Sequence, residues 1–294
     1  MISDGLWEHS FVLLIFLWKM TLGIYIKNKA LAGDSRLLSM RNELIAAGFS
    51  LYDIEVREDL RPGTDMVLSV GGDGTFLSAS KRVADSGIPI LGVNLGRLGF
   101  LSENKPEDIA DALLSGKYEY ENRTMLRASV SGCGSERDIA LWPYALNEVT
   151  VHRNGAAMLG INVSINGDKL PTYWADGLLV ATSSGSTAYS LSVGGPICAP
   201  DAKVLIIAPI APHNLNVRPL VVPEATEIGI SISTRDESAV LTMDNRTFSM
   251  DCSTELRVSM AQFSLKRVRL PKSGFVKALV SKLFWGEDIR NNGD

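Results

Sequence analysis

The sequence has few of the residues on which disulfide frameworks and cysteine-based zinc sites depend. Its 294 residues include three cysteines, Cys133, Cys198 and Cys252, which lie far apart and form no C-x-x-C spacing. This pattern disfavours both a zinc site and a set of structural disulfides. It fits a reducing compartment, so we expect a cytoplasmic protein.

An excess of basic charge is also missing. Lys and Arg together number 29 against 33 Asp and Glu, which gives a formal net charge of -4. A chain with this balance has no overall positive field to gather nucleic acid or anionic lipid. We therefore expect a small-molecule ligand, with neither nucleic acid nor a membrane as a partner.

The sequence contains no hydrophobic run of membrane-spanning length. The longest candidate, "FVLLIFLW" at 11–18, is too short to cross a bilayer and is interrupted by Lys19. It follows Asp4 and Glu8 instead of the positive segment that secretion requires. We expect residues 1–19 to be an N-terminal extension or a misassigned start; a genuine extra helix packed on the body is the alternative.

The chain does have enough apolar material for two cores, since 46% of its residues are hydrophobic. A strand is expected at Leu22–Ile26. The following segment has a capping Asp34, apolar residues at helical spacing and Gly48 as a stop, so it predicts a helix.

The next segment extends this α/β pattern. Apolar runs at 65–70 and 88–93 flank a helix-compatible stretch from Thr75 to about Ser86. This order predicts a parallel βαβ unit. We expect an α/β N-terminal domain with a parallel sheet over residues 20–117.

From about Tyr118 the pattern changes to short alternating or β-branched segments separated by turns. These segments are "LRASVSG", "ALNEVTVHR", "GINVSING", "GLLVATSS", "EIGISIST", "AVLTM" and "ELRVSMAQFSLKRVRL". They predict a β-rich C-terminal domain over 118–271. Apolar residues at helical intervals in 274–292 predict a C-terminal helix that returns to the N-terminal domain, which would then also include 272–294.

The stretch "VLSVGGDGTFLSAS", residues 67–80, places Asp73 among three glycines directly after an apolar run. It lacks the lysine of a P-loop and the spacing of a dinucleotide fingerprint, so neither motif applies. An Asp-Gly turn is the plain alternative. Where backbone amides and a metal handle phosphates, a carboxylate near an attacking hydroxyl can accept its proton, which makes Asp73 a candidate base. Thr75 is expected to cap the following helix.

A second stretch, "YWADGLLVATSSGSTAYSLSVGGP" at 173–196, contains a long run of small hydroxylated residues between apolar flanks. Backbone amides and hydroxyl groups in such a loop can face a polar ligand, and the ring of Tyr189 can lie against another ring. The alternative is an ordinary strand, turn and helix with a serine-rich cap.

Five motifs in series resemble the NAD kinases, of bacterial type, across about Met20 to Asn292. They are "GGDGT" 71–75, "NLGRLGFL" 94–101, "NE" 147–148, "ADGLLVATSSGSTAY" 175–189 and "APIAPHNLNVRPLVV" 208–222. The resemblance implies phosphorylation of NAD at the 2'-hydroxyl of its adenosine ribose, with ATP as donor and Mg²⁺ as cofactor. "GGDGT" alone is similar to a motif of lipid kinases and phosphofructokinases, so it does not separate the kinases.

The resemblance also implies roles for individual residues. Asp73 would be the base, Gly74 would lie by the ribose, and Asn147 with Glu148 would hold the adenosine end of NAD. Asp176 would accept from the nicotinamide carboxamide. The dinucleotide would be lined by Ser184, Thr187, Ala188, Tyr189 and Ser192. The donor phosphates would lie by Gly71, Gly72, Thr75 and Arg97. His213 would be a contact at best, and Arg97 in a turn has a plain surface role as its alternative.

Three features leave questions open. Thr182-Ser183-Ser184-Gly185 lacks the proline usual in the family, which predicts a looser loop. Asn245 replaces the glycine of a common Asp-Gly hairpin turn after Asp244, although Asn tolerates positive φ. The basic run Lys266, Arg267, Arg269 and Lys272 predicts a solvated strand end.

The resemblance further implies a homodimer or homotetramer. Two other functions remain open at this point. One is a lipid kinase acting on diacylglycerol or a sphingoid base, and the other is a dinucleotide-binding sensor that performs no catalysis.

Overall fold

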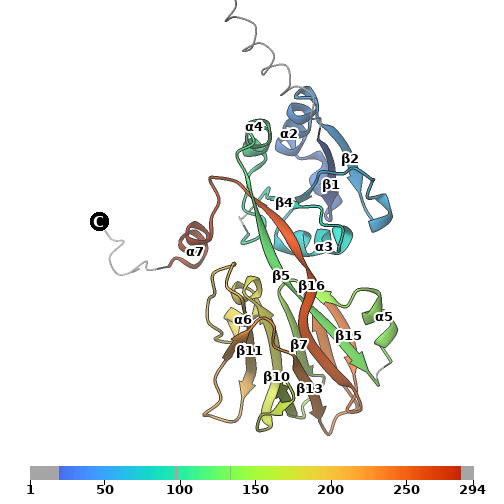
Figure 1. Ribbon diagram of the computed structural model, residues 1–294, viewed down its shortest axis with the longest axis vertical. Helices are drawn as coiled ribbons and strands as arrows, with labels where there is room; N and C mark the ends of the chain where they lie inside the picture. Colours follow the sequence, from blue (N-terminus) through green and yellow to red (C-terminus); the bar gives the residue numbers. More distant parts are fainter. Residues whose placement is uncertain (1–19, 97–98, 133, 286–294) are drawn as a thin grey trace, which may run out of the picture. The chain divides into compact units, whose positions relative to one another are not determined.

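A computed structural model describes residues 20–96, 99–132 and 134–285 of the chain. The expected extension at 1–19, Arg97 and the end of the expected C-terminal helix lie outside the described residues. The chain forms two compact units (Figure 1). The first unit comprises the described residues within 1–83, 88–119 and 268–294, and the second comprises those within 84–87 and 120–267.

The first unit is built from short strands and helices in alternation. Its strands are β1 (Thr21–Ile26), β2 (Ser50–Ile54), β3 (Met66–Val70) and β4 (Ile90–Val93). Its α-helices are α2 (Ser35–Ala46), α3 (Asp73–Val83), α4 (Ile109–Leu114) and α7 (Phe275–Leu283). Short 3-10 helices cover Lys29–Gly33, Arg57–Asp59 and Pro106–Asp108.

The sheet of the first unit is parallel, as the sequence predicts. β1 pairs with β2 and β3, and β3 pairs with β4, every pair parallel. β1, β3 and β4 are buried almost throughout, which is expected when helices cover a parallel sheet, while β2 at the edge is partly exposed. The carboxyl ends of β3 and β4 therefore lie side by side, where open α/β sheets place their ligands.

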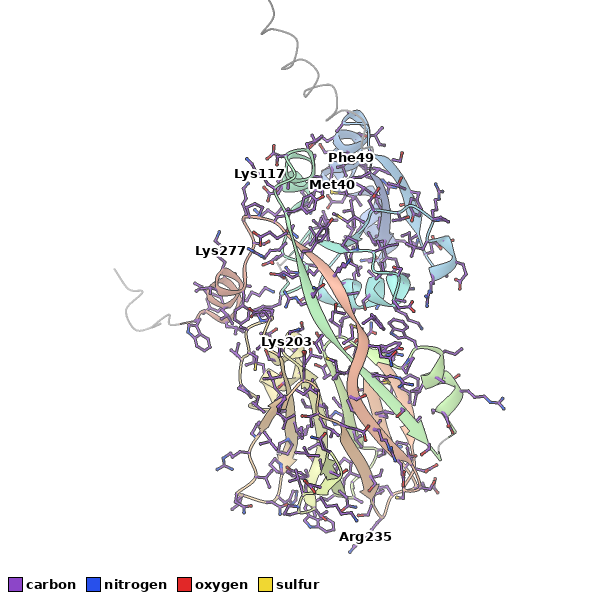
Figure 2. All side chains as sticks on the ribbon, in the orientation of Figure 1. Met40, Phe49, Lys117, Lys203, Arg235 and Lys277 are labelled. Atoms are coloured by element: carbon purple, nitrogen blue, oxygen red, sulfur yellow. The ribbon has the colours of Figure 1, made fainter. Side chains whose placement is uncertain are left out.

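Helix α2 shows how local sequence positions these elements. Asp34 is its N-cap and accepts a hydrogen bond from the Arg36 amide. Leu37, Met40 and Leu44 form its buried face at helical spacing and join the apolar core of the unit. Met40 and the partly buried Phe49, both labelled in Figure 2, belong to this apolar packing.

Helix α3 begins earlier than the sequence suggests. It starts at Asp73, and the Gly72 carbonyl accepts hydrogen bonds from the Thr75 and Phe76 amides. Thr75 therefore lies within the first turn, and the expectation that it caps the helix is wrong. The consequence is that Asp73 itself stands at the helix N-terminus, where partial positive charge favours a carboxylate.

The second unit is rich in strands. They are β5 (Glu119–Ser131), β6 (Tyr144–Ala145), β7 (Glu148–Arg153), β8 (Leu159–Ile165), β9 (Asp168–Lys169), β10 (Tyr173–Thr182), β11 (Val204–Pro212), β12 (Leu220–Pro223), β13 (Ile228–Ser233), β14 (Ala239–Met243), β15 (Arg246–Met250) and β16 (Glu255–Arg269). Its short helices are α5 (Glu136–Leu141), the 3-10 turn η5 (Ser184–Thr187) and α6 (Tyr189–Ser192).

The strand pairs of the second unit are antiparallel. Strand β10 pairs with β7, β8 and β11, and β7 also pairs with β14. Alternating side chains of these strands fill one large apolar core. The two-domain fold class predicted from the sequence is thus confirmed. No helix among the described residues is both long and apolar enough to cross a membrane.

The basic run at the end of β16 is solvated only in part: Lys266 and Lys272 are exposed, as the sequence predicts, but the arginines between them are not. Arg267 is only 2% exposed, and its guanidinium shares the Glu121 carboxylate with Arg123, which is 3% exposed. Burial alone would raise the pKa of Glu121, but the two guanidinium groups hold it below its ordinary value. Arg269 pairs with Glu119, an exposed partner.

The shared carboxylate yields a stability prediction. Glu121→Gln removes the negative charge that pairs with two buried guanidinium groups and should lower the free energy of unfolding by about 3 kcal/mol at neutral pH. Because the folded-state pKa of Glu121 is lowered, the deficit should narrow as the pH falls below the ordinary value of 4.5. Urea unfolding at pH 7 and pH 4 measures both effects.

Glu119→Gln is the matched control, two residues earlier on the same strand. Its side chain is 72% exposed, so its loss should change stability by no more than about 0.5 kcal/mol. Equal losses in the two variants would contradict the assignment of the buried cluster.

Candidate functional site

The glycine loop follows β3 at the carboxyl edge of the parallel sheet. The Gly71 amide donates to the Val93 carbonyl, which ties the loop to the end of β4. No heavy atom lies within 4 Å of the position that a Cβ would take at Gly72 or Gly74. The loop therefore presents open backbone at the start of α3, the kind of surface that a phosphate or sugar can approach.

The Asp73 carboxylate binds the backbone of a second motif. Its Oδ2 accepts from the Phe100 amide at 2.7 Å, and its Oδ1 accepts from Leu101 at 3.0 Å and Ser102 at 2.9 Å. The structure thus brings "GGDGT" and "NLGRLGFL" together through one side chain. A carboxylate offers about four lone-pair positions, so these bonds leave one position on Oδ2.

Gly99 shows how closely the two motifs approach. A Cβ at Gly99 would stand 1.7 Å from Asp73 Oδ1, so no other residue fits without moving the carboxylate. The Gly99 amide donates to the Ser102 carbonyl, and the Asn94 side chain donates to the same oxygen. The loop around 99–102 is therefore fixed by backbone contacts that sequence spacing does not reveal. Arg97, predicted at the donor phosphates, lies outside the described residues.

In the second unit, β7 and β10 bring the "NE" pair beside the serine-rich loop. Glu148 opposes Ala181 in the antiparallel register, and the Thr182 amide donates to the Asn147 carbonyl. A Cβ at Gly185 would stand 2.1 Å from that same carbonyl oxygen, so only glycine allows the loop to approach. Two motifs that the sequence separates by more than thirty residues thus form one surface.

Serine side chains hold the loop that lacks the usual proline. Ser183 Oγ donates to the Pro200 carbonyl at 3.1 Å. Ser186 Oγ donates to the Ser183 carbonyl at 2.7 Å and accepts from the Cys198 amide at 3.0 Å. These bonds fix 183–186 against 198–200. The side-chain contacts thereby restrict the loop, as the fixed φ of a proline would in part.

Glu148 is the most perturbed acid in this surface. Burial and the nearby Asp244 carboxyl raise its pKa from an ordinary 4.5 to about 8, while a hydrogen bond from the Tyr189 amide opposes the shift. Its residue is 8% exposed, and its Oε2 is buried without a hydrogen-bond partner. An acid in this setting holds its proton near neutral pH and offers one oxygen to a ligand.

Asp176 and Tyr189 each have a neighbour that the motifs do not include. Arg153 Nε lies 2.9 Å from Asp176 Oδ1. The His152 ring stacks on the Tyr189 ring with centroids 5.5 Å apart and planes 22° apart. Burial lowers the pKa of His152, and the charge of Asp176 opposes this. The alternation of polar Thr150 and His152 along "VTVHR" could have indicated that His152 reaches the site, but it gives no signal for the adjacent Arg153.

The remaining predicted residues lie around the same loop or away from it. Thr187 ends η5 and Ala188 links it to α6, both half-buried, and Ser192 is exposed at the end of α6. Ser184 is buried, with its Oγ 3.4 Å from Arg123 Nη1. His213 is exposed on the connection after β11 and is tied through its amide to the Trp174 carbonyl.

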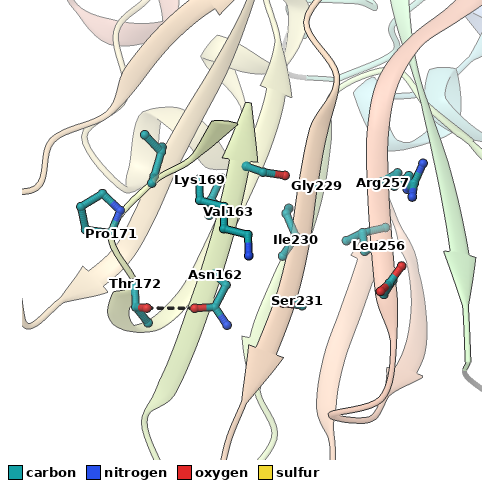
Figure 3. A pocket seen from close by; sticks show the side chains of 13 residues that line it. Asn162, Val163, Lys169, Pro171, Thr172, Gly229, Ile230, Ser231, Leu256 and Arg257 are labelled. Carbon is teal, nitrogen blue, oxygen red and sulfur yellow. Dashed lines mark hydrogen bonds between the residues drawn. The ribbon is translucent and has the colours of Figure 1, made fainter. Parts of the chain in front are cut away.

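A separate pocket of about 640 Å³ lies on another face of the second unit (Figure 3). It is lined by β8, β13 and β16, and Figure 3 shows the hydrogen bond from Thr172 to Asn162 at its edge. None of the predicted site residues lines it. Its volume therefore gives no support to the site described above.

Comparison with known families agrees with the two halves of this arrangement. The family model described as the ATP-NAD kinase N-terminal domain matches residues 36–117, and the one described as the ATP-NAD kinase C-terminal domain matches 146–270. The NAD kinase of Flavobacterium psychrophilum is 45% identical over 239 residues, which are 80% of each chain. That of Bacteroides fragilis is 42% identical over 230 residues, 77% of this chain and 78% of the relative.

Two solved structures share the fold. A yeast NADH kinase complexed with NADH superposes with a TM-score of 0.78 at 23% identity, covering 92% of this chain and 89% of the other. An NAD kinase from Archaeoglobus fulgidus in complex with ATP gives 0.68 at 24% identity, covering 86% and 94%. At these identities the likeness concerns the fold alone.

The raised pKa of Glu148 yields a prediction for the ligand-free protein. A carboxyl with a raised folded-state pKa contributes stability below its unfolded value, and this contribution is lost as the pH rises toward the folded value. Glu148→Gln cannot ionise, so its stability relative to the original protein should increase by about 3 kcal/mol from pH 5 to pH 8.5. Urea unfolding at the two pH values measures the change, and a difference that does not vary with pH would rule out a buried, proton-holding Glu148.

Proposed function

Because this chain belongs to the NAD kinase family, we propose that it transfers the γ-phosphoryl group of ATP to the 2'-hydroxyl of the adenosine ribose of NAD, giving NADP and ADP. Both domains of the family are matched, and curated relatives share 42–45% of their residues with it over most of its length. The transfer makes it a kinase acting on an alcohol group.

The observation that carries the proposal is the contact between Asn147–Glu148 and the loop from Gly185 to Tyr189. The glycine loop with Asp73 fits several kinase classes, but this second surface offers an amide, an unpartnered acid oxygen and a stacked ring together. Such a set can read a sugar hydroxyl and a base and fix their orientation, which phosphoryl transfer chiefly requires. A lipid kinase has no use for it.

We propose that Asp73 is the general base of the reaction. As the 2'-oxygen attacks the γ-phosphorus and the bond to the bridging oxygen of ADP breaks, the hydroxyl proton would pass to the carboxylate. The three amide bonds to Asp73 occupy both lone pairs of Oδ1 and one of Oδ2, so Oδ2 is the atom proposed to take the proton. The open backbone at Gly72 and Gly74 supports the approach of the ribose and phosphates.

Mg²⁺ is proposed as the cofactor that ATP brings on its own phosphates. Among the described residues no three His, Cys, Asp or Glu side chains form a cluster suited to a metal ion. Mg²⁺ commonly keeps several waters and binds through substrate phosphates with few protein ligands, so the residues present are compatible with it. When bound, it would offset negative charge on the donor.

Dinucleotide contacts are proposed for Asp176, Ser184, Thr187, Ala188, Tyr189 and Ser192, with His213 as an outer contact. We further propose a homodimer or homotetramer, as the family resemblance implies, and a cytoplasmic enzyme. Cys198 and Cys252 are free thiols, which is compatible with a reducing compartment. Light scattering coupled to size-exclusion chromatography measures the oligomer directly.

One assay separates the proposed function from its alternatives. The purified chain, incubated with NAD and MgATP, should form NADP detected by an NADP-specific dehydrogenase. Phosphorylation of diacylglycerol or a sphingoid base in place of NAD would indicate a lipid kinase. Binding of NAD with no NADP formed over hours would indicate a sensor, and either result would overturn the proposal.

Asp73→Asn tests the proposed base. The carboxamide is a very weak proton acceptor, so kcat should fall by about 10²- to 10⁴-fold, while the dissociation constant for NAD changes far less. Steady-state kinetics and calorimetric NAD binding measure the two effects. Unaltered turnover would remove Asp73 as the base.

Asn94→Ala is the control for the other role of Asp73, which is to hold the loop at 100–102 in place. Its side chain donates to the Ser102 carbonyl and accepts from the Gly96 amide, so its loss loosens the same loop and leaves the carboxylate in place. If Asn94→Ala lost as much kcat as Asp73→Asn, loop position and not proton transfer would explain the effect.

A further inference from the structure

Asp244 occupies the two-residue turn between β14 and β15, in the second unit. Met243 and Arg246 close the turn as a pair, and Asp244 has a φ of 52°. Asn245, which the sequence suggested would take the positive φ, is not among the residues with positive φ. The left-handed conformation at Asp244 is one that aspartate tolerates better than most residues because its side chain bonds locally.

The carboxylate of Asp244 binds three consecutive amides of a distant segment. Oδ2 accepts from the Leu146 amide at 2.9 Å, and Oδ1 accepts from Asn147 at 2.8 Å and more weakly from Glu148 at 3.4 Å. The Asp244 amide in turn donates to the Glu148 carbonyl at 3.0 Å. The turn therefore binds three amide donors of the segment 146–148 and one of its carbonyl acceptors.

We propose that Asp244 is the positioning residue of the Asn147–Glu148 pair, fixing the backbone from which both side chains reach NAD. The inference deepens the proposed function and rests on it, since it concerns how that NAD-binding pair is held. Asp244 does not itself touch the ligand, because its carboxylate accepts from backbone amides of the pair.

Asp244 affects the ligand site through its charge as well as through its hydrogen bonds, because the charge acts on Glu148. Burial raises the pKa of Asp244, but its three amide donors and the charge of Arg246 oppose this and favour the ionised form. Glu148 receives only one amide and has an unpartnered Oε2, so the ionised form is less well supported there. Of the two acids, Glu148 is therefore the one that holds a proton near neutral pH. Burial and the charge of Asp244 both raise its pKa. Arg246 faces Asp244 from the hairpin, and the Tyr189 phenol faces Glu148 from α6.

Asp244→Asn is the variant that tests this role. Asparagine adopts positive φ readily, so the turn is kept, but its NH₂ group must face a backbone N–H and at least one amide loses its acceptor. We expect kcat/KM for NAD to fall about 10- to 100-fold, as when a hydrogen bond to a charged group is lost. KM for ATP should change by less than about threefold.

The pH dependence adds a measurement that general destabilisation would not alter. Removing the charge of Asp244 removes one cause of the raised pKa of Glu148, so the midpoint at which KM for NAD changes with pH should move to lower pH. Asp244→Glu keeps the charge but displaces the carboxylate by one methylene. In Asp244→Glu, kcat/KM for NAD should therefore fall, while the pH midpoint of KM for NAD should stay closer to that of the original protein than in Asp244→Asn.

Asp251→Asn is the matched control. Asp251 lies in the turn at the other end of β15, where it accepts from the Ser253 amide and the Ser253 and Thr254 hydroxyls. Its loss should leave both KM values and the pH midpoint unchanged. The three variants and the original protein would be compared as full chains after thermal melting has shown each to be folded.

The outcomes separate this inference from the proposed function. If the original protein forms no NADP, the proposed function fails. If it forms NADP and Asp244→Asn keeps its kcat/KM for NAD and its pH midpoint, the positioning role is wrong and the function stands. Should Asp244→Asn not fold, Asp244→Glu decides by the same two measurements, with retained kcat/KM contradicting the inference.

Discussion

One interaction fixes the motif loops in both units: an aspartate at a sharp backbone position that accepts three consecutive amides from a remote segment. Asp73 holds 100–102 in the first unit, and Asp244 holds 146–148 in the second. Hydrogen bonds to an ionised acceptor are stronger than neutral ones, and three on one carboxylate leave little freedom to the segment that donates them. The contacts proposed for these two segments therefore depend on the two anchors.

The arrangement of elements could be predicted from the sequence because it follows from local patterns. The parallel order of β1, β3 and β4 follows from apolar runs separated by a helix, and α2 begins at the capping Asp34 that the sequence predicts. Where a local pattern competes with tertiary contacts, the prediction fails. Arg267 looks like one charge in a solvated run, but the pairing of its guanidinium with Glu121 lets it be buried. Nothing in the spacing of residues 121 and 267 signals that pairing.

The site itself divides in the same way. Its residue types were visible in the sequence as motifs, and the structure brings Asn147 and Glu148 against the loop at Gly185. The anchors were not visible. Asp73 drew attention as a chemical group, yet its hydrogen bonds to 100–102 span 27 to 29 residues. Asp244 drew attention only as part of a turn, yet its bonds span 96 to 98 residues. A side chain that binds backbone amides places no demand on the side chains of the residues that donate them, and apart from the space at Gly99 the sequences of 100–102 and 146–148 give no sign of these bonds.

The Asp244 anchor also explains why the second unit retains an unfavourable feature. Glu148 Oε2 is buried with no hydrogen-bond partner, and an unmet polar group of this kind costs about 1–3 kcal/mol. If Asp244 were absent, the segment could turn the acid toward solvent and recover that cost. With the backbone of 146–148 fixed, the acid stays buried and keeps its proton near neutral pH. A ligand that offers a hydrogen-bonding group to Oε2 removes the cost when it binds. The hydrogen bond to Oε2 thus contributes to the binding free energy of such a ligand. A molecule of the same size that lacks the hydrogen-bonding group does not gain this contribution.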